Sequence, residues 1–217
     1  MLTDPKAIAI ISHARQKNVA QANRSSRDFE RIFADFFAGH DFTGERIVDL
    51  GPGQWDFGRM VAERGGRCEG VDNDPAVLEL GTYLGMTVHD ANLRTFDPTP
   101  FAGQLDGLFC KFAVNAFWHK NDADRAAFTA SLDRMLTPQG WGWVAPWNGR
   151  PKEGVDDDAA RRILAAQRDA FAAVGWTAYE LTETQAQDYG MGGRVENHPL
   201  FIRGLELADG PRLSRAM

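Results

Sequence analysis

Short apolar runs alternate with longer amphipathic segments from residue 46 to near the end of the 217-residue chain. The first two runs, at 46–50 and 67–71, have the length and apolar character of buried strands. Residues 56–64 and 75–84 follow them with apolar positions at helical spacing. Strands that alternate with helices pair in parallel through right-handed crossovers. The pattern predicts an α/β fold: a doubly wound, mostly parallel, seven-stranded sheet with helices on both faces.

The same pattern sets the expected domain limits. Residues 1–40 precede the first strand and contain two stretches of helical periodicity, so we expect an N-terminal helical extension that could close over a site as a lid. The sheet domain would then span 41–217. Its remaining strands are expected at 86–89, 104–109, 141–145, 176–181 and 201–207, its remaining helices at 125–136 and 156–174, and a turn at 137–140.

Composition argues against several classes of protein. The chain has 24 Lys and Arg against 30 Asp and Glu, so its net charge of −6 disfavours a general nucleic-acid binder. Cys68 and Cys110 lie in apolar runs and are expected as buried thiols, and no cluster suits a metal ion. We see no signal peptide and no run long enough to cross a membrane. We therefore expect a cytoplasmic protein without a metal or a membrane partner.

A strand that runs into a glycine turn and then a helix is the most informative local motif. Gly51 and Gly53 lack β-carbons and tolerate positive φ, so a ligand can approach the backbone closely. Asp72 follows Gly53 by 19 residues and ends the second strand, where an acid reaches a ribose diol in dinucleotide-type folds. The alternative is a surface turn at 72–74, with Asp74 capping the next helix.

The residues after the turn bear on which ligand would bind there. A nicotinamide dinucleotide prefers a third glycine, because its pyrophosphate sits on the helix N-terminus. Asp56 occupies that position, directly after the bulky Trp55, and its carboxylate would repel a pyrophosphate. S-adenosylmethionine (SAM) has no phosphate and carries a sulfonium cation, so acids near its site are tolerable. The turn, Asp72 and Asp56 together favour SAM over a nicotinamide cofactor.

Five segments, in order along the chain, resemble the motifs of the class I SAM-dependent methyltransferases. The likeness spans about residues 45–145. The resemblance implies SAM as the cofactor and S-adenosylhomocysteine as its product. The segments are Val48-Asp49-Leu50-Gly51-Pro52-Gly53, Gly70-Val71-Asp72, His89-Asp90-Ala91-Asn92-Leu93, residues 105–118 and Leu136-Thr137-Pro138-Gln139-Gly140-Trp141.

The first two segments would hold the methionine and ribose parts of SAM. By the resemblance, Asp49 orders the turn or contacts the amino group, and the turn formed by Gly51, Pro52 and Gly53 borders the methionine. Asp72 would bind the ribose hydroxyls. An ionised carboxylate accepts from both hydroxyls, and such charge-assisted bonds are stronger than neutral ones.

The later segments would hold the adenine and the transferred methyl group. By the resemblance, Asn73 lies along the adenine ring, Asp90 accepts from the adenine amine, and the backbone of Ala91 donates to the ring. Three residues after the fourth strand would lie near the transferred methyl group: Lys111, Phe112 and Asn115.

The sequence departs from the family pattern in two places. The commonest first motif has a third glycine where this chain has Trp55, so the indole must turn aside or shape the pocket. The fourth motif is not Asn-Pro-Pro-Tyr or a relative, so the usual signature of amine methylation on nucleobases or glutamine is absent. The acid-plus-lysine arrangement of the magnesium-dependent catechol type is also absent.

Methyl transfer requires no fixed catalytic motif. The sulfonium is a good leaving group, so the protein mainly aligns the reactants and excludes water. A base is needed only if the acceptor must lose a proton. His119 could be that base or a structural histidine, and Lys111 could orient an anionic acceptor or cover apolar surface. Trp118, Trp143 and Trp147 could form an apolar wall or belong to the core.

We therefore predict a methyltransferase that transfers a methyl group from SAM to a small molecule. One alternative is a SAM-binding or regulatory protein without transfer activity. Another is a different SAM-fold enzyme, aminopropyltransferase-like or cyclising. The acceptor atom, the pathway and the oligomeric state, monomer or homodimer, stay open.

Overall fold

The computed structural model describes residues 3–15, 19–151, 153–192, 195–205 and 214–215. The strands are β1 Arg46–Leu50, β2 Arg67–Asp72, β3 Thr87–Asp90, β4 Leu105–Lys111, β5 Leu136–Ala145, β6 Thr177–Glu180, β7 Pro199–Arg203 and β8 Ser214–Arg215. The α-helices are α1 Pro5–Arg15, α2 Val19–Phe36, α3 Asp56–Ala62, α4 Pro75–Tyr83, α5 Asp122–Met135, α6 Asp157–Ala173 and α7 Glu183–Asp188. Three short 3₁₀ helices are η1 Thr99–Phe101, η2 Ala116–Trp118 and η3 Val195–Asn197.

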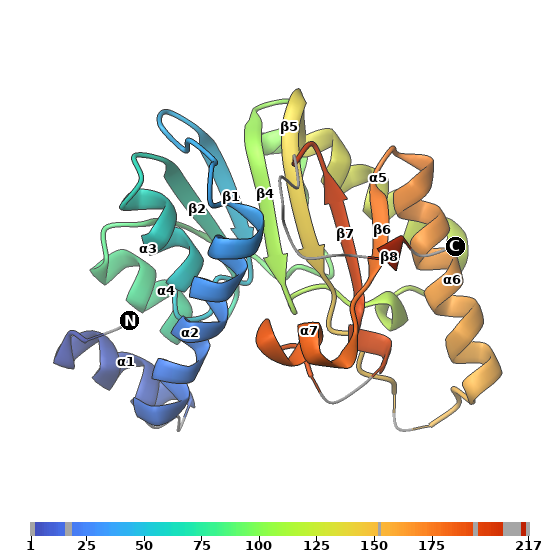
Figure 1. Ribbon diagram of the computed structural model, residues 1–217, viewed down its shortest axis with the longest axis horizontal. Coiled ribbons are helices and arrows are strands. Elements are labelled where there is room, and N and C mark those ends of the chain that lie inside the picture. The colour runs from blue at the N-terminus through green and yellow to red at the C-terminus, as the bar shows by residue number, and fades with distance from the viewer. Residues whose placement is uncertain (1–2, 16–18, 152, 193–194, 206–213, 216–217) are drawn as a thin grey trace.

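The strands form one sheet in the order β3-β2-β1-β4-β5-β7-β6-β8 (Figure 1). The five strands from β3 to β5 are parallel, and β7 runs antiparallel to both β5 and β6. The expected seven strands and their mostly parallel pairing are confirmed. The two-residue β8 adds to the edge at β6. Since β1, β2, β3 and β4 are parallel, their carboxyl ends meet at one edge of the sheet.

The two faces of the sheet are covered by different helices. On one face, α2 contributes four core residues that pack with Phe57, Phe109 and Trp143: Phe29, Ile32, Phe33 and Phe36. On the other face, α5 and α6 contribute residues to a cluster that also contains Val48, Leu50 and Leu108. Figure 1 shows α2 beside β1 and β4, with α5 and α6 farther along the sheet. Thus α2 shares the main core of the sheet. The division of the chain at residue 40 stays a prediction.

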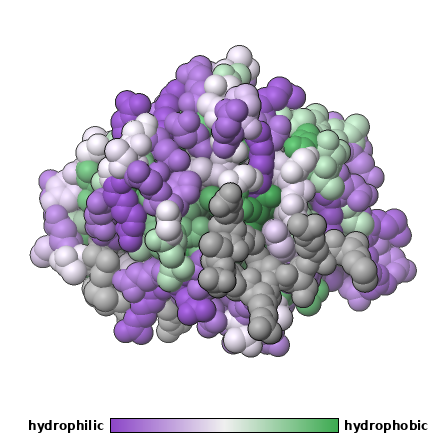
Figure 2. Space-filling view, turned by 45° about the horizontal axis from the view of Figure 1, so that its top comes forward, coloured by the Kyte–Doolittle hydropathy of each residue, from purple (hydrophilic) through white to green (hydrophobic). Residues whose placement is uncertain are grey.

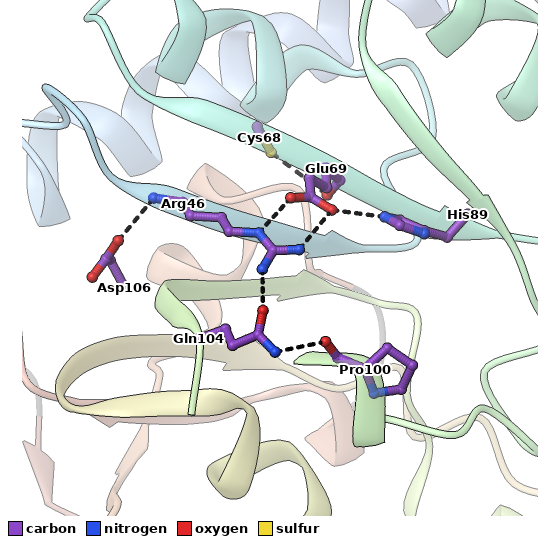
Figure 3. A network of polar contacts seen from close by, with 7 residues as sticks. All are labelled: Arg46, Cys68, Glu69, His89, Pro100, Gln104 and Asp106. Atoms are coloured by element: carbon purple, nitrogen blue, oxygen red, sulfur yellow. Dashed lines mark hydrogen bonds and ion pairs between the residues drawn. The ribbon is translucent and has the colours of Figure 1, made fainter. Parts of the chain in front are cut away.

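The crossover from β3 to β4 contains only η1, whereas the three neighbouring crossovers contain α-helices. A polar network covers the strands there (Figure 3). Arg46 Nε donates to Glu69 Oε1 at 2.6 Å, His89 Nε2 lies 2.7 Å from Glu69 Oε2, and Arg46 Nη1 donates to Gln104 Oε1 at 2.7 Å. Burial opposes the ionisation of Glu69, but the hydrogen bonds from Arg46 and His89 outweigh it and lower the pKa of that carboxyl group. The network therefore joins three strands where a helix is lacking.

Two local features differ from the sequence-based expectation. The turn expected at 137–140 lies inside β5, as a bulge: Leu105 pairs with Leu136, but Gly107 pairs with Trp141. Three extra residues of β5 loop out between these pairs. The helix α7 was not predicted, because it has only six residues; it is held by a capping box between Thr182 and Gln185.

Hydrophilic residues cover most of the face shown in Figure 2, and apolar residues gather mainly near its middle and at its upper right. The buried apolar side chains form three clusters, one on each face of the sheet and one between α1 and α4. Within the described residues, no helix has the length and apolarity needed to span a membrane.

Candidate functional site

The two glycines of the turn after β1 have different surroundings. Both need positive φ, +76° at Gly51 and +57° at Gly53. A β-carbon on Gly51 would lie 2.2 Å from Cβ of Ala113, so this position must be glycine for the loop after β4 to pack. A β-carbon on Gly53 would meet only the Gly51 carbonyl oxygen, at 4.0 Å. Gly53 therefore borders open space, as a ligand-facing position requires.

Trp55 turns away from that space into the protein core. It is fully buried with φ of +61°, and its Nε1 donates to the Val77 carbonyl oxygen at 2.9 Å. The indole fills the volume left by two glycines: a β-carbon on Gly70 would lie 2.2 Å from it, and one on Gly81 2.4 Å. Of the two sequence-based possibilities, turning aside is the one observed. The indole also packs in one cluster with Ile11 of α1.

Asp49, one residue before the end of β1, is a buried acid with no partner among the described residues. Its residue is 2 % exposed, and it forms no hydrogen bond or ion pair with any residue that the structure describes. Burial raises its pKa well above the usual value, and the nearby carboxylates of Asp72 and Asp56 raise it further. The side-chain oxygen of Gln54 is likewise buried without a partner. Such a group is stabilised by an incoming cation or hydrogen-bond donor.

The carboxylate at the end of β2 organises the following turn. Asp72 Oδ1 accepts from the backbone N–H groups of Asn73 at 2.8 Å and Asp74 at 2.9 Å. Asp74 is the N-cap of α4 and accepts from the Ala76 N–H at 2.9 Å, as expected. The helix-capping turn is therefore present, and Asp72 lies at the strand tip beside the glycine turn. Binding of a ribose by Asp72 stays a prediction.

The residues expected to bind adenine lie at the tip of β3 and the start of α4. Asp90 is exposed and pairs in register with Asp72, and Asn73 is also exposed. One expectation needs correction. The backbone N–H of Ala91, expected to donate to an adenine ring, donates instead to the Asp72 carbonyl oxygen at 3.0 Å. The parallel pairing of β2 and β3 continues one residue past the strands and occupies this donor.

Lys111 ends β4 at the same edge of the sheet and is buried. Its side chain is 9 % exposed. The Nζ atom lies 3.8 Å from Asp28 Oδ2 and 4.6 Å from the ring centroid of Phe29, both on α2. No described residue accepts a hydrogen bond from it. Burial lowers the pKa of Lys111 to about 8, against the opposing attraction of Asp28 and Asp56. Phe112 follows with φ of +67°, and its N–H donates to the Ala145 carbonyl oxygen.

The N-terminal half of α2 is tied to the helix after the glycine turn. Ser26 Oγ donates to Asp56 Oδ1 at 2.8 Å, and Arg59 Nη2 lies 2.6 Å from the same oxygen. Sequence reasoning missed the contacts of Ser26 and Asp28, because neither residue belongs to a motif. The only available signal was the amphipathic pattern of the helix, which marks Phe29 as inward-facing but does not identify its polar neighbours.

Asn115 and His119 flank η2, and their surroundings differ from those of Lys111. Asn115 is buried; its Oδ1 accepts from the Phe117 N–H at 2.8 Å, and its Nδ2 donates to the Gly149 carbonyl oxygen at 3.1 Å. His119 is half-buried against the ring of Phe128, with centroids 4.9 Å apart. Burial, with the Arg125 charge, lowers the pKa of His119 and favours the neutral imidazole. Catalytic roles for both residues stay predictions.

The three tryptophans considered for an acceptor wall lie in three environments. Trp143 is fully buried and stacks on Phe109 at 4.7 Å. Trp118 is partly buried under the guanidinium of Arg94. Trp147 is 48 % exposed, and its backbone N–H donates to the Val114 carbonyl oxygen. Trp143 is therefore a core residue.

No family model and no curated protein matches this sequence. Solved structures do match it. The SAM-bound amino pentose methyltransferase of calicheamicin biosynthesis from Micromonospora echinaspora aligns with a TM-score of 0.51 and 21 % identity, over 93 % of this chain and 97 % of that one. A chain of the complex between the Haloferax volcanii Trm112 methyltransferase activator and its methyltransferase partner gives 0.54 and 14 %, over 93 % and 97 %.

A sugar N-methyltransferase from a Streptoalloteichus species also aligns, with a TM-score of 0.50 and 16 % identity, over 93 % of each chain. The chain has the class I methyltransferase fold. At these identities the likeness supports only the arrangement of strands and helices. The residues described above lie at the edge where the carboxyl ends of β1, β2, β3 and β4 meet. The methyl acceptors named for these enzymes are properties of those enzymes and are not assigned to this protein by the likeness.

Proposed function

We propose that this protein is a SAM-dependent methyltransferase that acts on a small molecule. The observation that carries the proposal is Asp49, a buried carboxyl group with no partner among the described residues, directly before a turn whose Gly53 borders open space. SAM brings an ammonium and a sulfonium cation. Their charges would offset the repulsion among Asp49, Asp56 and Asp72, so the residues fit the group.

Residues at the ends of different strands would bind different parts of SAM. In this proposal Asp49 accepts from the methionine ammonium, while Gly51, Pro52 and Gly53 form the backbone wall beside it. Asp72 binds the ribose hydroxyls. At the adenine end, Asn73 lies along the ring and Asp90 accepts from the exocyclic amine. Ala91 would contribute its side chain, since its N–H is occupied, and Phe112 would border the methionine from the other strand.

The bound SAM supplies an activated methyl group on sulfur. The protein's part is to align the acceptor with that carbon and to exclude water. The middle of α2 suits the second task, because Ser26 joins it to α3, which follows β1, and Asp28 joins it to Lys111 at the end of β4. In this proposal residues 1–40 act as a lid. Lys111, Asn115 and His119 are the groups nearest to the acceptor.

Two considerations support a small acceptor. The net charge of −6 disfavours a polyanionic nucleic acid. Two of the structural neighbours are described as methyltransferases of sugars. The cytoplasmic location expected from the sequence belongs to the same proposal.

The experiment is calorimetric titration of the purified chain with SAM, S-adenosylhomocysteine and NAD. We expect the first two to bind and NAD not to bind. Asp72→Ala should weaken SAM binding by about 1–3 kcal/mol, the loss of a charge-assisted pair. Glu79→Ala is the matched control, because it removes an exposed carboxylate from the neighbouring α4.

The outcomes separate the candidate functions. Unchanged affinity in Asp72→Ala would remove Asp72 from the site, and absence of SAM binding by the wild type would overturn the proposal. Tight SAM binding without turnover across acceptor classes would favour a regulatory SAM-binding protein. Release of methylthioadenosine instead of S-adenosylhomocysteine would favour an aminopropyltransferase-like or cyclising enzyme.

A further inference from the structure

Lys111 is a buried ammonium with no hydrogen bond to any described residue, at the strand edge where the methyl acceptor would lie. A protonated lysine has three N–H donors, and burying them without hydrogen bonds is unfavourable. Its nearest carboxylate oxygen, Asp28 Oδ2 at 3.8 Å, is beyond hydrogen-bond distance. This arrangement is poor for a purely structural cation. It suits a group that exists as a neutral amine during part of a reaction cycle.

The walls around Lys111 come from three elements. From α2, Asp28 and the ring of Phe29 approach Nζ. From the turn after β4, the ring centroid of Phe112 lies 6.0 Å from Nζ. After α7, Gly190 closes in so tightly that a β-carbon there would lie 2.1 Å from Asp28 Oδ2 and 3.1 Å from Nζ. Two aromatic faces and a carboxylate surround the amine, and these groups would stabilise the ammonium that Lys111 becomes when it takes a proton.

The charge around this edge selects the acceptor. Asp56 acts electrostatically on both Asp49 and Lys111, Asp72 acts on Asp49, and Asp28 acts on Lys111. Acids therefore predominate among these groups. An anionic acceptor would meet several carboxylates, whereas an ammonium would be attracted. This charge pattern argues against an anionic acceptor, one of the two roles considered for Lys111.

We propose that Lys111 is the catalytic base that takes a proton from a protonated alkyl amine, and that this amine is the methyl acceptor. The inference rests on the proposed function. An alkyl amine is mostly an ammonium ion at neutral pH, with no lone pair for attack, so it must lose one proton inside the site. Transfer to Lys111 moves one positive charge from the acceptor to the lysine and leaves the total buried charge unchanged.

The reaction consists of a proton transfer followed by a methyl transfer. The neutral Lys111 Nζ uses its lone pair to take one proton from R–NH₃⁺, which gives R–NH₂ and the Lys111 ammonium. The amine nitrogen then forms a bond to the methyl carbon as the carbon–sulfur bond breaks, and sulfur keeps that electron pair. The product leaves as R–NH₂–CH₃⁺. Lys111 gives its proton to water when the site opens.

The proton affinity of Lys111 suits this role. Burial lowers its pKa to about 8, while Asp28 and Asp56 act in the opposite direction. A base works best when its pKa is near the working pH. The sulfonium of bound SAM, a further positive charge, would lower the pKa of Lys111 again.

The first test follows Lys111 directly, without an acceptor. NMR of protein labelled with ¹³C at lysine Cε would give its titration midpoint in complexes with SAM and with S-adenosylhomocysteine, which lacks the sulfonium charge. We expect the midpoint to be lower with SAM by about one pH unit. The spectrum of Lys111→Met assigns the signal, and the exposed Lys120 controls for changes in the sample. Equal midpoints in two complexes that both form would overturn the inference.

The second test measures transfer to matched probes. With methyl-labelled SAM, we expect benzylamine to be methylated and benzyl alcohol not to be. Lys111→Met should lower kcat/KM for the amine at pH 7 by about 100-fold or more, and should remove the inflection that the wild type shows at the Lys111 midpoint of the SAM complex. Its affinity for SAM at pH 7 should not fall below that of the wild type and should rise several-fold, because the variant lacks the lysine charge that repels the sulfonium. Lys111→Arg should not restore the rate, since a guanidinium remains protonated.

The two proposals fail in different ways. If SAM does not bind the wild-type protein, the proposed function fails. If SAM binds but the Lys111 midpoint is the same with both cofactors, only the base assignment fails. Methylation of the alcohol alone would overturn the amine as acceptor. A Lys111→Met variant with the wild-type rate and pH profile would overturn the role of Lys111. Calorimetric SAM binding by that variant shows that it is folded.

Discussion

The segment after β1 and the segment after β4 leave the same edge of the sheet but are built in opposite ways. The first, from Gly51 to Trp55, contains two glycines that expose the backbone, and φ is positive at three of its residues. The second begins at Lys111 and Phe112, and full side chains enclose it, among them two phenylalanine rings. One segment offers space and backbone, whereas the other offers a charged group in an apolar surround.

The difference teaches where each half of the chemistry resides. A site made of backbone binds whatever fits its shape, and it is encoded locally, in consecutive residues. A site made of side chains depends on partners from elsewhere; Asp28 and Phe29 come from α2, far earlier in the chain. The first segment therefore suits a common cofactor. The second suits an acceptor particular to this protein. Four predictions test this contrast.

The largest effect is expected from Trp55→Ala, which tests the largest side chain in the segment after β1. Removing the fully buried indole leaves a cavity between α3, α4 and α1, and should lower the free energy of unfolding by about 3–5 kcal/mol. Urea denaturation would measure it. Trp147→Ala, at a 48 % exposed indole, is the control and should change stability by less than about 1 kcal/mol. Equal losses would contradict the packing role of Trp55.

Next come the two glycines, which should respond differently. Gly51→Ala forces a β-carbon to within 2.2 Å of Ala113 at positive φ and should destabilise the fold by about 2–4 kcal/mol. Gly53→Val meets open space, so the protein should fold with only the backbone strain of about 1–2 kcal/mol, but it should lose SAM binding. Urea denaturation and calorimetry together check the pair. Normal SAM binding by Gly53→Val would show that the turn is not the pocket.

The third prediction concerns the pH dependence of stability at Lys111. Its pKa is about 8 in the folded protein, against 10.5 for an ordinary lysine, so between these pH values the unfolded chain binds more protons. Stability from this residue therefore rises as pH rises from 8 to 10.5, by about 1–3 kcal/mol. Denaturation of wild type and Lys111→Met across this range measures the difference. A constant difference between the two proteins would show that Lys111 titrates normally.

The smallest effect is expected at Asp49, and its sign is unusual. Its raised pKa means that ionisation opposes folding, so wild-type stability falls as pH rises from about 4 through the folded pKa. Asp49→Asn should be more stable than wild type at pH 8 by about 1 kcal/mol, a rise in Tm of about 2–4 °C. It should also bind SAM at least tenfold more weakly. Thermal melts at pH 4 and pH 8 provide the test, since the gain should vanish at pH 4.

Much of the fold could be predicted from the sequence, because its information is local. The period of apolar residues gave all seven main strands, with most boundaries within three residues of those observed. The Asp74 cap depends on neighbours in sequence and was predicted correctly. The bulge in β5 could not be predicted, because its three extra residues are visible only against the register of β4. A turn-like sequence can sit inside a strand when the partner strand continues past it.

In the candidate site, too, the features that depend on neighbouring residues in the sequence could be predicted, and those that depend on distant residues could not. Asp49, Gly53 and Asp72 were placed at strand tips by motif spacing, and the structure has them there. The surroundings of Lys111 could not be foreseen, because nothing in a helical pattern says which strand the helix will cross. The same limit applied to the Ala91 N–H, whose partner is a carbonyl group on a neighbouring strand.

The indole of Trp55 has an evolutionary consequence. It occupies the volume that side chains at Gly70 and Gly81 would need, so these three positions cannot vary independently. A substitution at either glycine requires that the tryptophan is already gone and that a second neighbour also shifts, Pro52 beside Gly70 or Val88 beside Gly81. Loss of the tryptophan is mild only if the glycines have gained bulk. Epistasis of this kind should appear among homologues as an inverse relation between side-chain size at position 55 and at positions 70 and 81.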